Sequence, residues 1–328
     1  MNRRRFMTAT ASLAATAMLP KTSVAQTVKK SATVELVPVT YLQTPMQLQF
    51  QRNIESLKNK PYQDFFNGEL RVPMEMVKGL HQPLPADQVF APTAEALNEA
   101  LENIDNAPVS GYGVINDGEK GIAAFSRSRH FMPNVTSEMF KWWMLWHTVE
   151  KERYMLWFPQ AHINNSLADP ERAADKSLSY EARFYNNPNH ITEYIGDTLL
   201  DTIAVFVPPE QIGFRSEVLK AKNITASASG WSHPVGADNV AMATLIHLVR
   251  DVEGGAELIS FYWTTPHAEL SRIAKIKGAG ERGVQAMSAH LTEEKALAIA
   301  YEMSVHDMTE FTHLAEILPE LYAQFGQL

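Results

Sequence analysis

The chain has 328 residues, with 37 acidic residues against 29 basic ones and a formal net charge of −8. This length suits one large domain, or one domain with a smaller one beside it. The acidic excess argues against binding to nucleic acids or to anionic membrane surfaces. Because the chain has no cysteine, disulfides and thiolate ligands are excluded, and any metal site would have to use His, Asp and Glu.

Residues 1–25 have the pattern of an export signal. The stretch NRRRFM (Asn2–Met7) contains paired arginines, a mildly apolar run follows it, and Ser23-Val24-Ala25 suits cleavage after small residues. The apolar run is too short to span a bilayer, so we expect no membrane insertion. We expect export of the folded protein by the twin-arginine route, to the periplasm or out of the cell. A mature chain beginning near Gln26 loses four basic residues and no acidic one, which takes the net charge from −8 to near −12.

Residues 26–108 are predicted to form a small helical domain. The stretches PMQLQFQRNIESLKN (Pro45–Asn59) and PTAEALNEALENI (Pro92–Ile104) have helical character, and the second places Leu97, Leu101 and Ile104 on one face. A segment of this size buries little core by itself. We therefore expect it to pack on the rest of the chain or on a second subunit, which would make the protein a homodimer.

Residues 109–328 are predicted to form an α+β domain with an antiparallel sheet. A helix over residues 137–157 is expected to end before Pro159, and a long, largely apolar helix over Thr292–Phe325 closes the chain. Turn residues separate the short strand-like runs. These runs are GYGVIN (111–116), GIAAFSRS (121–128), YEARFYN (180–186), HITEYIG (190–196), TIAVFVP (202–208), ITASASG (224–230), NVAMATLIHLVRD (239–251) and AELISFYWTT (256–265). A curved sheet that grips the terminal helix would leave a cavity between them.

Polar side chains interrupt the apolar surface of the terminal helix. His306 and Glu310 are four residues apart, so they share a face, and His313 lies one turn further on. An unpaired buried carboxylate is costly, so the pair needs a partner, and a metal ion is one candidate. A solvated ion pair is the alternative explanation of an isolated HxxxE motif.

Two further segments place polar residues where core is expected. In the run HITEYIG, strand alternation puts Glu193 on the same face as two isoleucines, either at an exposed edge or as a buried ligand. His162 follows the predicted end of the helix over 137–157, and Asn165 comes three residues later. Taken alone, His162 would more often be a structural histidine.

Other histidines have weaker patterns. A hairpin turn at Gly254-Gly255 would place His247 opposite Tyr262 on one face of the sheet, where the alternative is a plain cross-strand core pair. His147 and Glu150 form an HxxE pattern on a helix rich in tryptophan, so we rank them below the other candidates as metal ligands.

Three segments together resemble the diacetylphloroglucinol hydrolase family, which includes phloretin hydrolase. They are WWMLWHTVEKERYMLWFPQAHINN (142–165), ITEYIG (191–196) and HDMTE (306–310). The resemblance implies zinc enzymes that hydrolyse a carbon–carbon bond between an acyl group and a phenolic ring. It also implies a helix-grip (Bet v1-like) domain behind a small helical dimerisation domain. An export signal is a departure from that family.

The resemblance assigns roles residue by residue. His162 with Glu193 31 residues later, and His306 with Glu310, would be the four metal ligands. Tyr154 lies eight residues before His162 and Asn165 three after it, and His247 and Tyr262 are fifteen residues apart, all as in the family. The catalytic set implied is Tyr154, Asn165, His247 and Tyr262.

These residues would support hydrolysis of an acylated polyphenol. A metal held by two His and two Glu would acidify water and polarise the acyl carbonyl; zinc fits this set of ligands, as would Fe²⁺ or Mn²⁺. Tyr154, Asn165 and Tyr262 would hold ring hydroxyls or the acyl oxygen, and His247 would relay a proton. The alternatives are a non-catalytic binding protein for small aromatic ligands and a metal-dependent ester hydrolase.

Overall fold

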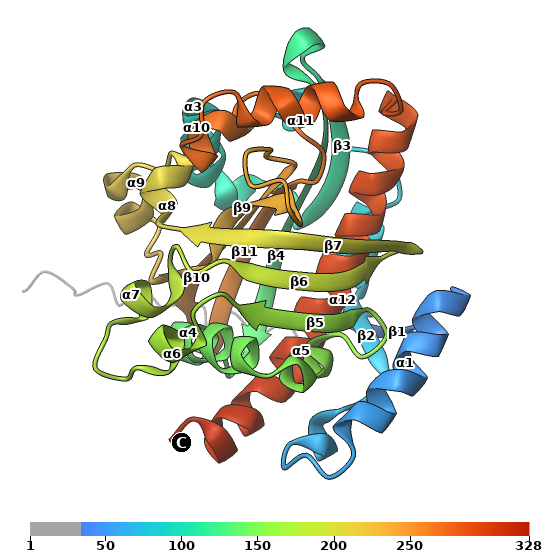
Figure 1. The fold of residues 1–328 in the computed structure, drawn as a ribbon, viewed down its shortest axis with the longest axis vertical. Helices are drawn as coiled ribbons and strands as arrows, with labels where there is room; N and C mark the ends of the chain where they lie inside the picture. The colour runs from blue at the N-terminus through green and yellow to red at the C-terminus, as the bar shows by residue number, and fades with distance from the viewer. Residues whose placement is uncertain (1–33, 328) are drawn as a thin grey trace, which may run out of the picture. The chain divides into compact units, whose positions relative to one another are not determined.

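A nine-stranded antiparallel sheet forms the centre of the structure, a computed structural model that describes residues 34–327 (Figure 1). The expected export signal, residues 1–25, lies outside the described residues. The strands follow the order β3-β4-β11-β10-β9-β7-β6-β5, and a short strand, β8, pairs with β10. Their bounds are β3 (Ser110–Asn116), β4 (Ile122–Pro133), β5 (His162–Leu167), β6 (Asn189–Ile195), β7 (Thr198–Val207), β8 (Ala226–Ser227), β9 (Ser229–Pro234), β10 (Ala243–Val252) and β11 (Gly255–Trp263).

The long C-terminal helix α12 (Glu293–Phe325) packs against this sheet, mainly on β3 and β4. Thr292 caps its N-terminus by accepting a hydrogen bond from the backbone N–H of Lys295, and two glutamates in the first turn complement the helix dipole. Strands β5 to β7 run across the direction of β3 and β4, so the sheet curves around the helix (Figure 1). This arrangement confirms the predicted α+β helix-grip fold.

The expected helix over residues 137–157 is broken in the middle. It consists of α4 (Ser137–Trp146), the short 3-10 helix η5 (His147–Val149) and α5 (Lys151–Trp157). Thr148 Oγ1 donates back to the carbonyls of the preceding turn, and Glu150 has an extended backbone. The prediction of one continuous helix was therefore wrong: the chain leaves the helical conformation at Glu150, and Thr148 bonds carbonyls of the last turn of α4.

One predicted strand, YEARFYN, is instead the helix α7 (Tyr180–Phe184). Ser179 accepts a hydrogen bond from the backbone N–H of Ala182 and so caps its first turn, which outweighs the strand preference of the aromatic residues. The remaining helices of this region are α6 (Pro170–Ala174), α8 (Pro209–Ile212), α9 (Ser216–Ala221), α10 (Leu270–Ala274), α11 (Ala279–Met287) and η4 (Gly118–Lys120).

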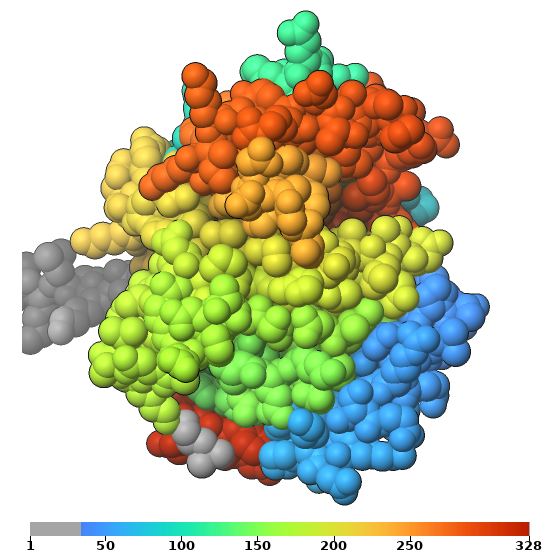
Figure 2. All heavy atoms as spheres, viewed as in Figure 1, coloured from blue at the N-terminus to red at the C-terminus, as the bar shows by residue number. Residues whose placement is uncertain are grey.

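Residues 34–108 contain the expected helices and also a small sheet. The helices are α1 (Thr44–Leu57), α2 (Met74–Gly79) and α3 (Ala94–Glu102), joined by η1 (Gln63–Phe65), η2 (Ala86–Gln88) and η3 (Ile104–Asn106); the strands β1 (Leu36–Val39) and β2 (Leu70–Pro73) pair with each other. The segment packs on the rest of the chain: Leu57 joins the core around α12, and Leu97 joins the core on the outer face of the sheet. In Figure 2, the blue residues of this segment lie against green residues from later in the chain. Its role in dimerisation stays a prediction.

Two apolar cores lie on opposite sides of the sheet. The inner one joins α12, α4 and α5 to the sheet through Phe311, Trp143 and Leu156, and the outer one is built around Phe261 and Trp263. Over the range 34–327, no helix combines the length and the hydropathy that a membrane span requires.

Candidate metal centre and pocket

Strand pairing brings the first two candidate ligands together. β5 begins at His162, and its register places His162 directly opposite Glu193 of β6. Asn53, buried on α1, donates hydrogen bonds to the backbone carbonyls of Pro159 and His162 at 2.9 and 2.8 Å. Sequence reasoning did not foresee strand β5, although this strand explains why a histidine and a glutamate 31 residues apart meet.

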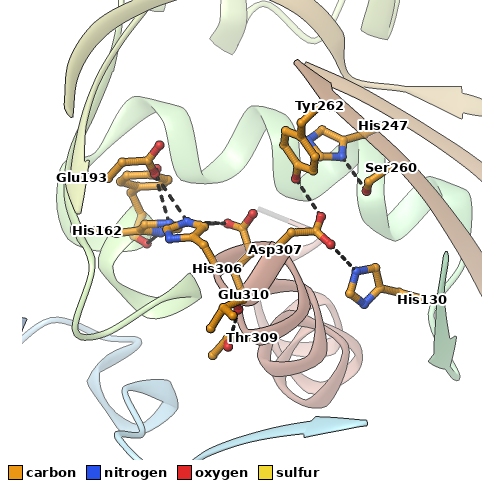
Figure 3. Close-up of polar contacts among 12 residues, drawn as sticks. His130, His162, Glu193, His247, Ser260, Tyr262, His306, Asp307, Thr309 and Glu310 are labelled. Atoms are coloured by element: carbon orange, nitrogen blue, oxygen red, sulfur yellow. Dashed lines mark hydrogen bonds and ion pairs between the residues drawn. The ribbon is translucent and has the colours of Figure 1, made fainter. Parts of the chain in front are cut away.

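α12 brings the other two candidate ligands to the same point. His162 Nε2 lies 3.4 Å from Glu193 Oε2 and 3.5 Å from Glu310 Oε2, and His306 Nε2 lies 3.8 and 3.7 Å from the same two oxygens. Four ligands placed tetrahedrally about 2.0–2.2 Å from one ion would be about 3.3–3.6 Å apart. His162, His306 and Glu310 offer ligand atoms that all lie within 4.8 Å of one another. These three residues could therefore hold a metal ion; Glu193 is not part of that mutually close group, although one of its oxygens lies near both histidines, and Figure 3 shows the four side chains pointing toward one another.

A hydrogen bond orients the His162 ring so that its Nε2 atom could bind a cation. Its Nδ1 donates to the backbone carbonyl of Tyr154 at 3.1 Å, so Nε2 carries the lone pair. That Nε2 atom is buried and has no hydrogen-bond partner. A buried polar atom without a partner is costly, and a cation would provide one.

Burial makes the charged forms of these groups unfavourable. It raises the pKa of Glu310 well above its usual range and also raises the pKa of Glu193. It lowers the pKa of His162 well below its usual range and also lowers the pKa of His306. A divalent cation would reverse the cost for the two carboxylates, because a nearby opposite charge stabilises the ionised form. Two carboxylates and one divalent ion would also leave the buried cluster without net charge.

A pocket between the sheet and α12 opens onto these groups. Three of the four candidate ligands and all four predicted catalytic residues line it, while the fourth ligand, His162, is fully buried behind it. Tyr154 donates a hydrogen bond to Glu193 Oε2 at 2.5 Å. The remaining walls are mostly apolar, among them Trp157, Ile191, Leu245 and Met303. Such a pocket suits a flat, largely apolar ring with a few polar substituents.

The relation between His247 and Tyr262 differs from the predicted one. The turn lies at Glu253-Gly254, with Gly254 at φ +81°, one residue earlier than expected. As a result, His247 pairs with Ser260, and Tyr262 pairs with Leu245. The prediction that His247 lies directly opposite Tyr262 was wrong, but the two side chains share a face and their ring centroids are 5.3 Å apart.

A second buried polar cluster adjoins the candidate ligands, and sequence reasoning missed it. Asp307 Oδ1 accepts from the Tyr262 hydroxyl at 2.7 Å, and Oδ2 lies 2.9 Å from His130 Nε2 (Figure 3). Burial alone would raise the pKa of Asp307, but the nearby His130 and the hydrogen bonds with His130 and Tyr262 lower it. The signal in the sequence was an aspartate beside His306 on a helix with little polar surface.

The weaker candidates fall outside the ligand cluster. His147 lines the pocket, but its Nδ1 lies 2.7 Å from the Trp143 carbonyl and its Nε2 lies 3.3 Å from Asn165 Nδ2. Glu150 instead pairs with Lys60 at 2.5 Å. His313 is buried on α12 and does not line the pocket. The HxxE pattern of residues 147 and 150 therefore does not form a metal site.

Comparisons with known proteins point to one family. Residues 90–323 match the family model described as the DAPG hydrolase PhiG domain. The 2,4-diacetylphloroglucinol hydrolase of Pseudomonas sp is 37% identical over 292 residues, covering 89% of this chain and 97% of its own. Its counterpart in Pseudomonas protegens is 36% identical over 292 residues, covering 89% and 93%.

More distant similarities were also found. Phloretin hydrolase of Eubacterium ramulus is 24% identical over 273 residues, covering 82% of this chain and 92% of its own. The crystal structure of Ara h 8.0201 aligns with 56% of this chain and 99% of its own, at 9% identity and a TM-score of 0.25. The fold assignment rests on the strand order and on the position of α12.

Proposed function

Because the chain belongs to the diacetylphloroglucinol (DAPG) hydrolase family, we propose that it is a metal-dependent hydrolase of carbon–carbon bonds. The bond it breaks joins an acyl group to a phenolic ring, and the substrate is an acylphloroglucinol-like compound. Two relatives are named for 2,4-diacetylphloroglucinol and one for phloretin. The convergence of two His nitrogens on two Glu oxygens at 3.4–3.8 Å carries the proposal.

The ion would be held by His162, Glu193, His306 and Glu310. Nitrogen and oxygen donors at these separations suit zinc, and Fe²⁺ or Mn²⁺ would accept the same set. When bound, the ion supplies Lewis acidity, which polarises a carbonyl and acidifies water. Tyr154 holds the Glu193 carboxylate through its hydroxyl and so fixes the direction of that ligand.

The reaction adds water across the bond between the acyl group and the ring. The hydroxyl of water joins the acyl carbon and gives a carboxylic acid, and a proton takes the place of the acyl group on the ring carbon. His247 lines the pocket, and burial lowers its pKa to about 4, so it is neutral near pH 7. A neutral imidazole can accept a proton from water and pass it on, which is the role we assign to His247.

The other polar residues of the pocket would hold the substrate. Tyr262 and Asn165 line the same cavity as the ligands, and burial raises the pKa of Tyr262 well above its usual range, so its hydroxyl stays protonated. We assign both to hydrogen bonds with the substituents of the ring. The apolar walls would cover the faces of the ring and keep bulk water away from it.

Replacement of one ligand tests the proposed site. Glu310→Gln keeps the size of the side chain and removes the charge, so the purified protein should lose most of its bound metal and its cleavage of 2,4-diacetylphloroglucinol. Glu320→Gln is the matched control, because Glu320 is exposed on the same helix. Metal content is measured by mass spectrometry and folding by circular dichroism. A folded Glu310→Gln protein with the metal content and activity of the control would contradict the proposal.

We also propose export by the twin-arginine route and assembly as a homodimer. The first is supported by the NRRRFM stretch and the small residues up to Ala25. The second is supported by exposed apolar side chains on and beside α1: Leu42 is 81% exposed and Leu48 is 53% exposed.

A further inference from the structure

His147 makes two hydrogen bonds whose directions can be worked out. Its ring is fully buried, stacked on Trp143 with centroids 4.9 Å apart and packed edge-on against Trp157 at 5.4 Å. Nδ1 lies 2.7 Å from the backbone carbonyl of Trp143, and Nε2 lies 3.3 Å from Asn165 Nδ2. A carbonyl oxygen can only accept, so Nδ1 must carry the hydrogen.

The same reasoning then fixes the amide of Asn165. A neutral imidazole with its hydrogen on Nδ1 has a lone pair on Nε2, which can only accept. Asn165 must therefore present its NH₂ group to His147. The imidazole is neutral because burial lowers the pKa of His147 to about 3. Turning the amide over would place the Asn165 oxygen against the lone pair of Nε2.

The amide oxygen of Asn165 is left for a ligand. Asn165 lines the pocket beside Glu193 and Tyr154, and its Oδ1 is buried without a hydrogen-bond partner. An oxygen in that position accepts hydrogen bonds and cannot donate them. It would pair with a hydroxyl of the substrate and would repel the oxygen of a carbonyl or an ether.

We propose that His147 is a positioning residue that holds the Asn165 amide with its oxygen toward the pocket, so that this position selects a free ring hydroxyl. The inference rests on the proposed function and sharpens it. A substrate needs a hydroxyl that can donate at the Asn165 position, and the acyl oxygen binds elsewhere. A ring whose hydroxyl there is methylated leaves Oδ1 buried and unpaired, which is the kind of mismatch that sites discriminate against strongly.

A double-mutant cycle separates positioning from a merely structural role. His147→Phe keeps an aromatic ring among the tryptophans and removes both nitrogens, and Asn165→Leu removes the amide. KM and kcat are measured for 2,4-diacetylphloroglucinol and for each of its mono-O-methyl ethers. In the wild type, one ether should be a poorer substrate by about tenfold or more in kcat/KM. In His147→Phe, the ratio of kcat/KM for 2,4-diacetylphloroglucinol to kcat/KM for that ether should fall below about threefold, with metal content unchanged.

The two substitutions should not be additive, because His147 acts through Asn165. In the Asn165→Leu background, His147→Phe should change KM by less than about twofold. The proposal would be overturned if His147→Phe changed KM by the same factor in the wild type and in Asn165→Leu. It would also be overturned if His147→Phe kept the full preference for the hydroxylated substrate.

Nitrogen NMR gives a test that does not depend on a folded variant or on turnover. In wild-type protein labelled with ¹⁵N-histidine, the imidazole of His147 should have its hydrogen on Nδ1 and an unprotonated Nε2 whose resonance shifts when phloroglucinol is added. The signal is assigned by its absence from a folded His147 variant or, failing that, by its through-space contacts with Trp143. An Nε2–H tautomer at His147 would overturn the inference. Failure of wild-type protein to cleave any acylphloroglucinol would instead overturn the proposed function, while the tautomer could still be observed.

Discussion

The Tyr262 hydroxyl donates a hydrogen bond to Asp307 Oδ1 at 2.7 Å and so links strand β11 to the helix that carries two candidate ligands. Asp307 is 1% exposed, and its other oxygen lies 2.9 Å from His130 Nε2. A buried carboxylate that accepts from two side chains in this way fixes both of them. Because the proton of Tyr262 is committed to Asp307, the lone pairs of its oxygen remain to accept from a substrate hydroxyl.

Removing the charge of Asp307 should be more costly than removing the hydroxyl of Tyr262. Asp307→Asn removes the charge and turns one of the two acceptor oxygens into an NH₂ group, so either His130 or Tyr262 loses its acceptor, and we expect the free energy of unfolding to fall by about 3–5 kcal/mol. Tyr262→Phe removes one hydrogen bond and should cost about 1–2 kcal/mol. Urea unfolding of the metal-free proteins measures both. Equal losses in the two variants would show that Asp307 is not the centre of this cluster.

Buried neutral histidines should make the protein less stable in mild acid. Burial lowers the pKa of His147 to about 3 and that of His247 to about 4, against about 6.5 in an unfolded chain. Between those values the unfolded state binds more protons than the native state, so stability falls as the pH falls below about 6.5. His147→Phe removes one such group.

The slope of stability against pH is the measured quantity. Between about pH 4 and pH 6, it should be shallower in His147→Phe than in the wild type by about one proton, or about 1.4 kcal/mol per pH unit. Comparing the two proteins cancels the contributions of the glutamates. Parallel slopes would mean that His147 is protonated in the native state, which would also remove the basis for the Asn165 orientation.

The sequence predicted elements with strong patterns better than it predicted breaks and registers. The apolar surface of α12 and the strand character of Glu193 were enough to identify oddly placed polar residues. The break at Glu150 and the helix at Tyr180–Phe184 depend on local backbone conformation and on a capping side chain, which hydrophobic periodicity does not report.

The residues in and around the pocket were also predicted only in part. Residues implied by the family resemblance lie together, whereas Asp307 and the role of His147 depend on tertiary contacts that spacing cannot reveal. The position of the turn at Gly254 moved the partner of His247 by two residues, because a two-residue hairpin loop fixes the register of both strands.

Export should depend on the paired arginines at the start of the chain. Residues 1–30 fused to a reporter that only the twin-arginine route exports should carry it out of the cytoplasm, with cleavage after Ala25. Changing Arg3 and Arg4 to lysine keeps the charge and should abolish export. A reporter that stays inside in the first case, or leaves equally well in the second, would contradict this prediction.

Assembly should depend on the apolar surface of residues 34–108. We expect light scattering to give the mass of a dimer at micromolar concentration. Leu48→Glu on α1 should shift the protein towards monomer, because Leu48 is 53% exposed and a charge there would be buried in an interface. Leu199→Glu is the control with equal charge, because Leu199 is 52% exposed and lies on β7, outside residues 34–108. A monomeric wild type would remove this prediction without affecting the pocket.

Product analysis with and without metal tests the central claim most directly. The purified protein is stripped with a chelator, divided, and one half is reloaded with Zn²⁺ before both halves receive 2,4-diacetylphloroglucinol. We expect the reloaded half to release monoacetylphloroglucinol and acetate in equal amounts, and the stripped half to release neither above the rate of the buffer. Equal cleavage in both halves, or cleavage in neither while the reloaded protein holds one zinc per chain, would contradict the account.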